Sequence, residues 1–256
     1  MCLINLHVNN HPNYKLIVAA NRDEFYERPT APAHLWEDEP QILAGRDLIQ
    51  MGTWLGVTKQ GRFAALTNFR DPEHMQPGTF SRGEIAKNYL STDVSPEEFL
   101  HTLKQDKAKY VGFNVILGNT EQLFHYNNVH NEITEIPAGT HGLSNDTLNT
   151  PWPKVTKGKK KLREYVMNQK EIQPNKLFEI VSDTEEAHIG DLPKTGVGLD
   201  FERKLSPLFI RTPDYGTRSS TVLLVDKQDN VLFHERTFDQ GELKKENHFS
   251  FRIENF

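Results

Sequence analysis

The chain opens with "CLINLHVNNHPNYKLIVAANR" (residues 2–22), in which two apolar runs flank a short polar segment. The runs cover residues 2–8 and 15–22, and the segment between them, "NNHPNY", consists of turn-forming residues. Apolar, β-branched runs on either side of such residues are typical of two antiparallel strands joined by a hairpin. The sequence therefore predicts an N-terminal hairpin with Cys2 at the end of its first strand.

The rest of the sequence contains further strand-like runs and two helical blocks. The strand-like runs lie at residues 53–58, 62–69, 110–119, 122–128, 131–137, 220–226 and 230–238, and helical patterns lie within residues 81–110 and 152–183. Many short strands joined by turns indicate largely antiparallel sheets. Because strands and helices come in separate groups, we predict α+β layers rather than alternating βαβ units.

Two local patterns refine this outline. Ser95 and Glu98 form an S-x-x-E capping signature, with Pro96 at the first helical position. The segment "GRD" (residues 45–47) lies between strand-like runs and is interpreted as a turn. From such a turn, Arg46 would line the mouth of a site.

Two longer segments suggest function. Residues 183–207 form the longest irregular stretch, and a long loop in a compact domain is more often functional than idle. The basic run "KGKKKLR" (residues 157–163) lies in a helical block. We interpret this run as a solvated helix face, with a phosphate-bearing ligand or an anionic membrane as the alternative.

Composition limits the classes of function. A chain of 256 residues can form one compact domain, which we expect to span residues 1–256. The net charge of −5 gives no general attraction for nucleic acid, so a small molecule or another protein is the expected partner. One cysteine excludes an internal disulfide, and no run approaches the roughly 20 apolar residues of a membrane span. The N-terminus lacks the features of a secretory or transit signal, so we expect a cytoplasmic protein without integral membrane association.

The position of the single cysteine points to chemistry. A lone thiol in an apolar strand is usually a small buried hydrophobic group. At residue 2, however, removal of Met1 would place a thiol and a free α-amine on one residue, with ordinary pKa values of about 8.5 and 7.7–8.0. An amine in that range can accept the thiol proton at neutral pH. Cys2 would then supply both nucleophile and base.

Four consecutive polar residues, Asn21, Arg22, Asp23 and Glu24, follow the second apolar run. The hairpin would bring them close to Cys2. One interpretation is an exposed strand end whose charges pair with solvent and with one another. The other is that Arg22 lowers the pKa of the thiol while a carboxylate orients the α-ammonium group.

Polar residues also end or precede other strand-like runs. Asn68 and Arg70 follow one run, Asn145 lies in a loop before a helical block, and Arg218 precedes the run at residues 220–226. An Asn side chain can donate to a developing oxyanion, and an Arg can bind a carboxylate or phosphate through two parallel bonds. Taken singly, Asn at a strand end is mostly turn chemistry.

An ordered set of motifs carries a family resemblance. The motifs are "NRDE" (residues 21–24), "GTWLGV" (52–57), "TNFR" (67–70), "SRG" (81–83), "GFN" (112–114), "HGLSN" (141–145) and "LNTPWPKV" (148–155). In this order they resemble the NRDE family, the relatives of transport and Golgi organization protein 2, over almost the whole chain. The resemblance implies a four-layer αββα sandwich of the N-terminal-nucleophile hydrolase type with mostly antiparallel sheets.

The same resemblance implies a set of site residues. Penicillin V acylases and bile-salt hydrolases share this fold type and cleave amides with an N-terminal Cys, an Arg, an Asp, two Asn and a later Arg. The matching positions are Cys2, Arg22, Asp23, Asn68, Asn145 and Arg218, with Asn21, Arg46 and Arg70 as expected substrate-binding residues. In those enzymes the Arg and the Asp are three residues apart, whereas here they are adjacent. Since i and i+2 share a strand face, either Glu24 takes the acid role or the strand has ended by Asp23.

Two classes of function follow from the resemblance. The first is an amidohydrolase or acyl hydrolase that acts on a small amide or thioester and requires no cofactor. The second is a non-catalytic protein of lipid, acyl-CoA or haem trafficking, in which the pocket holds a hydrophobic anionic ligand. Because a thiolate can ligate haem iron, Cys2 alone does not separate the two classes. No expectation is attached to the oligomeric state.

Overall fold

A computed structural model describes residues 2–70 and 80–254 of the chain. Its contacts divide the chain into two compact units. The first unit combines Met1–Glu27 with Ala138–Phe251, and the second combines Arg28–Pro137 with Arg252–Phe256. The expectation of one domain over residues 1–256 stays a prediction.

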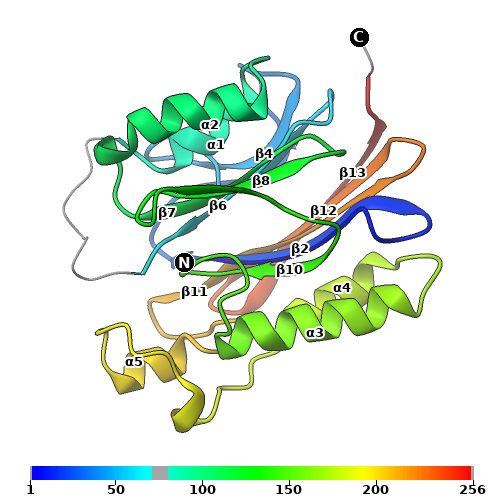
Figure 1. Ribbon diagram of the computed structural model, residues 1–256. Coiled ribbons are helices and arrows are strands. Elements are labelled where there is room, and N and C mark those ends of the chain that lie inside the picture. The colour runs from blue at the N-terminus through cyan, green and yellow to red at the C-terminus, as the bar shows by residue number, and fades with distance from the viewer. Residues whose placement is uncertain (1, 71–79, 255–256) are drawn as a thin grey trace. The chain divides into compact units, whose positions relative to one another are not determined.

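The first unit is built on a six-stranded antiparallel sheet in the order β10-β1-β2-β11-β12-β13 (Figure 1). Its strands are β1 (Cys2–Val8), β2 (Tyr14–Phe25), β10 (Gly139–Leu143), β11 (Tyr215–Asp226), β12 (Asn230–Asp239) and β13 (Glu242–Arg252). The predicted N-terminal hairpin is confirmed, because β1 and β2 pair over the full length of β1. Strand β2 is longer than predicted and continues to Phe25.

Helices α3 (Pro153–Met167) and α4 (Pro174–Val181) cover one face of this sheet (Figure 1). Helix α3 packs on β1 and β10, and α4 packs on β2 and β11. Ile17 and Ala19 of β2 belong to the same buried cluster as Leu162 of α3 and Phe178 of α4. Residues at odd positions of β2 therefore face the helices, and residues at even positions face away from them.

Helix α3 approaches β1 closely at one point. A Cβ atom at Gly158 would lie only 2.5 Å from Oδ1 of the fully buried Asn5. Only a residue without a side chain fits there, so Gly158 lets the helix rest directly on the first strand. This contact fixes the N-terminal half of α3 next to the strand that carries Cys2.

The second unit contains a seven-stranded antiparallel sheet whose strands follow one another in chain order. The strands are β3 (Thr30–Leu35), β4 (Ile42–Asp47), β5 (Leu55–Thr58), β6 (Phe63–Asn68), β7 (Phe113–Gly118), β8 (Leu123–Asn127) and β9 (Glu132–Glu135). Helix α1 (Gly83–Leu90) packs on β5, β6 and β7, and α2 (Pro96–Gln105) follows it in the chain. The predicted cap is confirmed, because Ser95 Oγ accepts a hydrogen bond from the Glu98 amide at 3.2 Å.

The prediction of a turn at residues 45–47 is wrong. Gly45, Arg46 and Asp47 belong to β4, where Arg46 and Asp47 pair with residues of β3. The ring of Trp54 lies 2.4 Å from the place where a Cβ of Gly45 would be, so this glycine makes room for a tryptophan rather than for a turn. Long-range pairing and packing thus override the local turn preference.

Some elements carry little signal in the sequence. Strands β3, β4, β10 and β13 were not predicted, and β13 is a mostly polar, largely exposed strand at one edge of its sheet. The stretch predicted as irregular, residues 183–207, contains the short helix α5 (Leu199–Lys204) and the 3-10 turn η3 (Ile189–Asp191). A second 3-10 turn, η2 (Lys107–Lys109), follows α2. Among the described helices, none has the length and apolar character needed to cross a membrane.

Candidate functional site

Cys2 is the first residue of β1 and lies directly opposite Arg22 of β2. Residues opposite each other in an antiparallel pair project from the same face of the sheet. This is the face away from α3 and α4, because Arg22 is at an even position of β2. Cys2 is half-buried, and Arg22 is buried. The predicted proximity of Cys2 and Arg22 is therefore present in the first unit.

Asn145 is linked to Cys2 through its neighbour Ser144. Ser144 Oγ lies 3.0 Å from the carbonyl oxygen of Cys2 and 3.1 Å from Oδ1 of Asn145, so its hydroxyl group donates to one of the two. Asn145 is fully buried and follows the end of β10, which pairs with β1. The sheet therefore brings Asn145 to the same end of β1 as the thiol.

Several groups act on the pKa of the Cys2 thiol. Burial of the thiol is the largest influence and raises its pKa above the ordinary value. The negative charge of Asp23 also raises the pKa, whereas the positive charge of the chain's N-terminus, that of Arg22 and a hydrogen bond from the Asp23 backbone lower it. The net result is a thiol that is protonated in its resting state and has a nearby cation to stabilise the thiolate once it forms.

Asp23 lies on the opposite face of β2, towards the helices. Its side chain is 1% exposed, and Thr217 Oγ1 donates a hydrogen bond of 2.7 Å to Oδ1. Burial raises the pKa of this carboxyl group, and attraction to Lys154 is the first of the influences that oppose the rise. Asp23 is thus a buried carboxylate whose main counter-charge comes from Lys154.

Lys154 is a site residue that the sequence analysis missed. It lies in the first turn of α3, within the motif "LNTPWPKV", and is only 2% exposed. Lysine is almost never fully buried unless it is paired. In the sequence Lys154 precedes a basic run in the same helix, and such a run predicts lysines that are exposed to solvent. Only the packing of α3 on β1 and β10 reveals its burial.

A β-bulge in β11 disturbs the regular alternation of side chains near Glu24. The pairing of β2 with β11 shifts by one residue between Thr217 and Ser219, opposite Asp23 and Arg22. Strand β2 therefore has not ended at Asp23, yet both Arg22 and Asp23 influence the thiol. Glu24 is half-buried and accepts a hydrogen bond of 2.9 Å from the adjacent Phe25 amide. Its assignment as the acid stays a prediction.

Arg218 is the extra residue of that bulge. Its Nη1 donates to the carbonyl oxygens of Phe25 at 2.8 Å and Tyr26 at 2.9 Å. These bonds tie the end of β2 to β11, just beyond Arg22 and Asp23. Arg218 therefore supports the geometry of the site from the backbone side, and its assignment as a catalytic residue stays a prediction.

Asn21 uses its side chain within the protein. Nδ2 donates to the carbonyl oxygens of Val181 and Leu208, both at 2.8 Å, and Oδ1 accepts from Ser220 Oγ at 2.6 Å. These bonds connect β2 to the end of α4, to the segment before β11 and to β11 itself. Asn21 thus stabilises the strand that carries Arg22. Its role in substrate binding stays a prediction.

Three predicted residues belong to the second unit. Asn68 is the last residue of β6, and Arg70 follows it in a half-buried position. Arg46 of β4 makes two bonds of 2.6 Å to Asp38, which hold the pKa of that carboxyl group at about 2. The participation of Asn68, Arg46 and Arg70 in the site stays a prediction.

Metal binding has no visible basis in the described parts of the chain. Within residues 2–70 and 80–254, no group of three or more His, Cys, Asp or Glu side chains is arranged to hold a metal ion. The expectations that no cofactor is required and that haem is a ligand stay predictions. The chemistry that the cluster itself offers is that of a thiol nucleophile beside an arginine, with an amide side chain at the same strand end.

Sequence comparisons show the family relationship of the chain. A family model described as Transport and Golgi organisation 2 matches residues 1–240. The Transport and Golgi organization protein 2 homolog of Bos taurus is 34% identical over 257 residues, covering 93% of both chains. The homolog of Homo sapiens is 33% identical over 263 residues, covering 95% of both chains. The resemblance expected from the motifs is thereby confirmed.

Solved structures confirm the fold type. A mutant of conjugated bile acid hydrolase from Clostridium perfringens matches with a TM-score of 0.57 at 10% identity, covering 100% of this chain and 94% of that one. A Caenorhabditis elegans ortholog of N-acylethanolamine-hydrolyzing acid amidase matches with a TM-score of 0.52 at 10% identity, covering 87% of this chain and 92% of that one. The predicted α+β fold of the N-terminal-nucleophile hydrolase type is correct. At this identity the likeness concerns the fold.

The charges around Cys2 predict opposite effects of two substitutions on thiol reactivity. Arg22→Met should move the midpoint of the pH–rate profile for alkylation by iodoacetamide to higher pH, because the thiolate loses a stabilising cation. Asp23→Asn should move the midpoint to lower pH. The chain has one cysteine, so the total alkylation rate reports on Cys2 alone. Lys244→Met, at an exposed position of β13, is the control with unchanged midpoint. Equal midpoints in all four proteins would show that these charges do not act on the thiol.

The Asp23–Lys154 attraction predicts strong coupling between the two side chains. Asp23→Asn and Lys154→Met should each lower the free energy of unfolding by about 3 kcal/mol, because each leaves a buried charge without its partner. The double variant should lose about 1–3 kcal/mol less than the sum of the two. Urea unfolding of the four proteins measures the cycle. Additive losses, within about 0.5 kcal/mol, would mean that the two groups do not interact.

Proposed function

Because the chain belongs to the Transport and Golgi organisation 2 family and places its one cysteine opposite a buried arginine, we propose that it is an N-terminal-cysteine hydrolase. Its substrate is a small amide or thioester. The observation that carries the proposal is the register of β1 against β2, which sets Cys2 directly opposite Arg22. A merely structural cysteine would not need a cation on the same face of the sheet.

The proposed reaction begins after removal of Met1. The freed α-amine of Cys2 takes the thiol proton, and the thiolate attacks the carbonyl carbon of the substrate. The rise in the thiol pKa caused by burial keeps the thiol neutral at rest, and Arg22 stabilises the thiolate as it forms. Cys2 thus carries the nucleophile and the base, and Arg22 lowers the energy of the charged state.

The tetrahedral intermediate then needs hydrogen-bond donors at its oxyanion. Asn145 supplies one through its side-chain amide, whose Oδ1 lies 3.1 Å from Ser144 Oγ. Collapse of the intermediate breaks the bond to the leaving amine or thiol, which takes the proton from the α-ammonium group. Water then cleaves the thioester between the acyl group and Cys2 and regenerates the thiol.

Asp23 and Lys154 have supporting roles in this scheme. The Asp23 backbone donates a hydrogen bond to the thiol, and its carboxylate is held by Thr217 and attracted by Lys154. Lys154 therefore reduces the negative field that Asp23 would otherwise exert on the forming thiolate. The Asp23–Lys154 pair thus fixes the end of β2. The positive charge of Lys154 also weakens the repulsion between Asp23 and the thiolate of Cys2.

The substrate class rests on the acyl-transfer chemistry of the cluster. The solved structures with this fold include a conjugated bile acid hydrolase and an N-acylethanolamine-hydrolyzing acid amidase, and both names denote hydrolysis. We extend hydrolysis to this chain, with a hydrophobic acyl amide or acyl thioester as its substrate. The reaction uses no cofactor, and we place it in the cytoplasm.

One observation favours a second candidate function. The relatives from Bos taurus and Homo sapiens carry names that refer to transport and Golgi organization rather than to hydrolysis. On this reading the site binds a hydrophobic anionic ligand, such as an acyl-CoA or haem, and Arg22 meets its carboxylate or phosphate. The Cys2 thiol then ligates the haem iron or lines the binding site, and it undergoes no acyl transfer.

One experiment separates the two candidates. Protein that begins at Cys2 should release free acid from a panel of acyl amides and acyl thioesters, and Cys2→Ala should lower kcat by about 10³-fold or more, because the nucleophile is gone. A form with an added residue before Cys2 should lose activity to a similar degree, because it lacks the α-amine. Lys244→Met is the control with unchanged turnover. Turnover that survives Cys2→Ala would refute the nucleophile, and saturable acyl-CoA or haem binding by that variant without turnover in any form would favour the transport function.

A further inference from the structure

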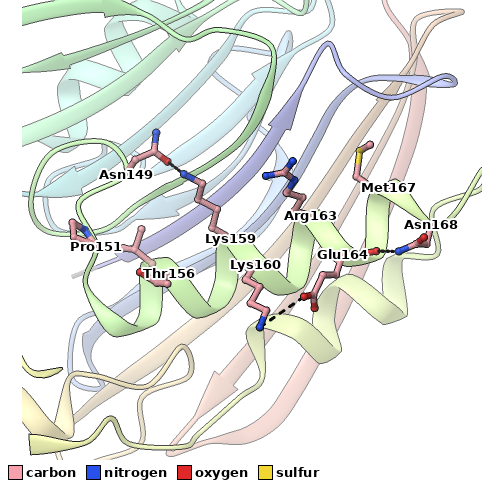
Figure 2. A pocket seen from close by; sticks show the side chains of 10 residues that line it. Asn149, Pro151, Thr156, Lys159, Lys160, Arg163, Glu164, Met167 and Asn168 are labelled. Carbon is pink, nitrogen blue, oxygen red and sulfur yellow. Dashed lines mark hydrogen bonds and ion pairs between the residues drawn. The ribbon is translucent and has the colours of Figure 1, made fainter. Parts of the chain in front are cut away.

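A groove of about 740 Å³ runs along the outer face of helix α3. It is lined by Asn149 and Pro151 from the segment before the helix and by helix residues Val155, Thr156, Lys159, Lys160, Arg163, Glu164, Met167 and Asn168 (Figure 2). Val155, Lys159, Arg163 and Met167 follow one another at intervals of four residues, so they form one ridge of the helix. Two cations therefore lie next to each other in the middle of the groove.

The basic run of α3 divides into two groups of charges. Lys157 and Lys161 both contact Asp183, at 2.8 Å and 2.5 Å, and Lys157 also contacts Glu185 at 2.6 Å. Their charges are thus balanced by acids that follow α4. Neither lysine lines the groove. The run is therefore not a uniformly solvated face, and its remaining cations are the ones that line the groove.

The groove cations have little acidic compensation. Lys160 and Glu164 are 3.9 Å apart and exposed, so this pair is weak. Lys159 Nζ bonds to Asn149 Oδ1 at 2.9 Å, and a neutral amide does not cancel its charge. Within residues 2–70 and 80–254, no acidic side chain forms an ion pair with Arg163. The groove therefore presents an excess of positive charge although the chain as a whole is acidic.

The position of Lys159 is fixed by the loop before the helix. Asn149 has a positive φ of 64°, accepts a hydrogen bond from the Gly142 amide at 3.1 Å and donates one to His141 Nδ1 at 3.0 Å. Its Oδ1 then holds Lys159, as Figure 2 shows. Such anchoring reduces the side-chain entropy that a ligand would otherwise have to overcome. Arg163, one helical turn further on, extends from the same side of α3 (Figure 2).

We propose that this groove binds the phosphate group of a small phosphate ester between Lys159 and Arg163. A phosphate offers three acceptor oxygens, which suit the two parallel donors of a guanidinium group together with one ammonium group. Met167 on the same ridge and Pro151 before the helix offer apolar surface to the organic part of the ester. The charge excess favours an anion, and a phosphate group has acceptor oxygens for both Lys159 and Arg163.

The dimensions favour a small molecule over a membrane surface. A volume of about 740 Å³ lies within the range of small-molecule sites, roughly 300–1,000 Å³. Helices that lie on a membrane present large apolar residues beside their cations. On α3 the large apolar residues Leu162 and Val166 are buried against the sheet, and Met167 is the one exposed large apolar side chain of this helix. This face of α3 could therefore attract an anionic membrane, but it has few apolar side chains to insert into one.

The groove is independent of the proposed hydrolase site. None of its lining residues belongs to the cluster of Cys2, Arg22, Asp23, Asn145 and Lys154. Substitutions in the groove can therefore be made without touching the residues assigned to acyl transfer. Pyrophosphate binding by Cys2→Ala should equal that of the unmodified protein.

Calorimetric titration of the full chain with pyrophosphate at low salt tests the proposal. We expect saturable binding of one ion per chain, an affinity that falls with added salt, and a loss of at least about 10-fold in the double variant Lys159→Gln/Arg163→Gln. Lys244→Gln/Lys245→Gln removes the same charge from exposed positions of β13 and should bind as the unmodified chain does. The single variant Arg163→Gln, at an exposed position, keeps the fold intact if the double variant unfolds.

Three outcomes would overturn the proposal. The first is an absence of saturable pyrophosphate binding by the unmodified chain. The second is an equal loss of affinity in the two double variants, which would indicate a general charge effect. The third comes from co-sedimentation with phosphatidylcholine vesicles that contain phosphatidic acid. If Lys159 and Arg163 are needed there while pyrophosphate does not bind, the face recognises a lipid surface instead of a small ester.

Discussion

The pairing of β1 with β2 is the constraint on which the rest of the site depends. Because side chains alternate along a strand, a shift of one residue in this register would turn Cys2 away from Arg22 and exchange the two buried faces of β1. Burial of alternate residues against α3 and α4 makes such a shift costly. The hydrophobic packing of one face thereby determines which side chain stands beside the thiol on the other.

A balance of opposing electrostatic effects follows from this placement. Burial disfavours the thiolate of Cys2, whereas Arg22 favours it. On the other face of the same strand, burial disfavours the carboxylate of Asp23, and Lys154 compensates. The buried side chains of Arg22, Asp23 and Lys154 thus accompany a neutral thiol. This arrangement is stable at rest and stabilises negative charge on sulfur once a base removes the proton.

Local patterns in the sequence predicted the hairpin, the cap at Ser95 and the separation of helices from strands, because each depends on neighbouring residues. They failed where distant packing decides. Gly45 looked like a turn residue but makes room for Trp54, and Lys154 looked solvated until α3 was seen to pack on β1 and β10. The bulge at Arg218 has no local signature either, since it arises from the pairing of β11 with β2.

The candidate site shows the same division. The sequence predicted that Arg22 approaches Cys2, because a hairpin dictates it. The motifs supplied the candidates Asn68 and Asn145, but no local pattern gives the distance between residues that are far apart in the chain. Of the two, Asn145 is brought to the end of β1 by the pairing of β10 with β1, together with Ser144. The order of strands in a sheet depends on residues that are far apart in the chain, so the structure was needed to establish it.

The central claim is that Cys2 acts with its own α-amine, and this requires that Met1 be absent. The intact mass of protein expressed from its natural start codon measures this directly. We expect a mass lower than that of the full sequence by one methionine residue, which leaves Cys2 as the N-terminal residue. Retention of Met1 would leave no free amine on Cys2 and would contradict the proposed role of the α-amine as base.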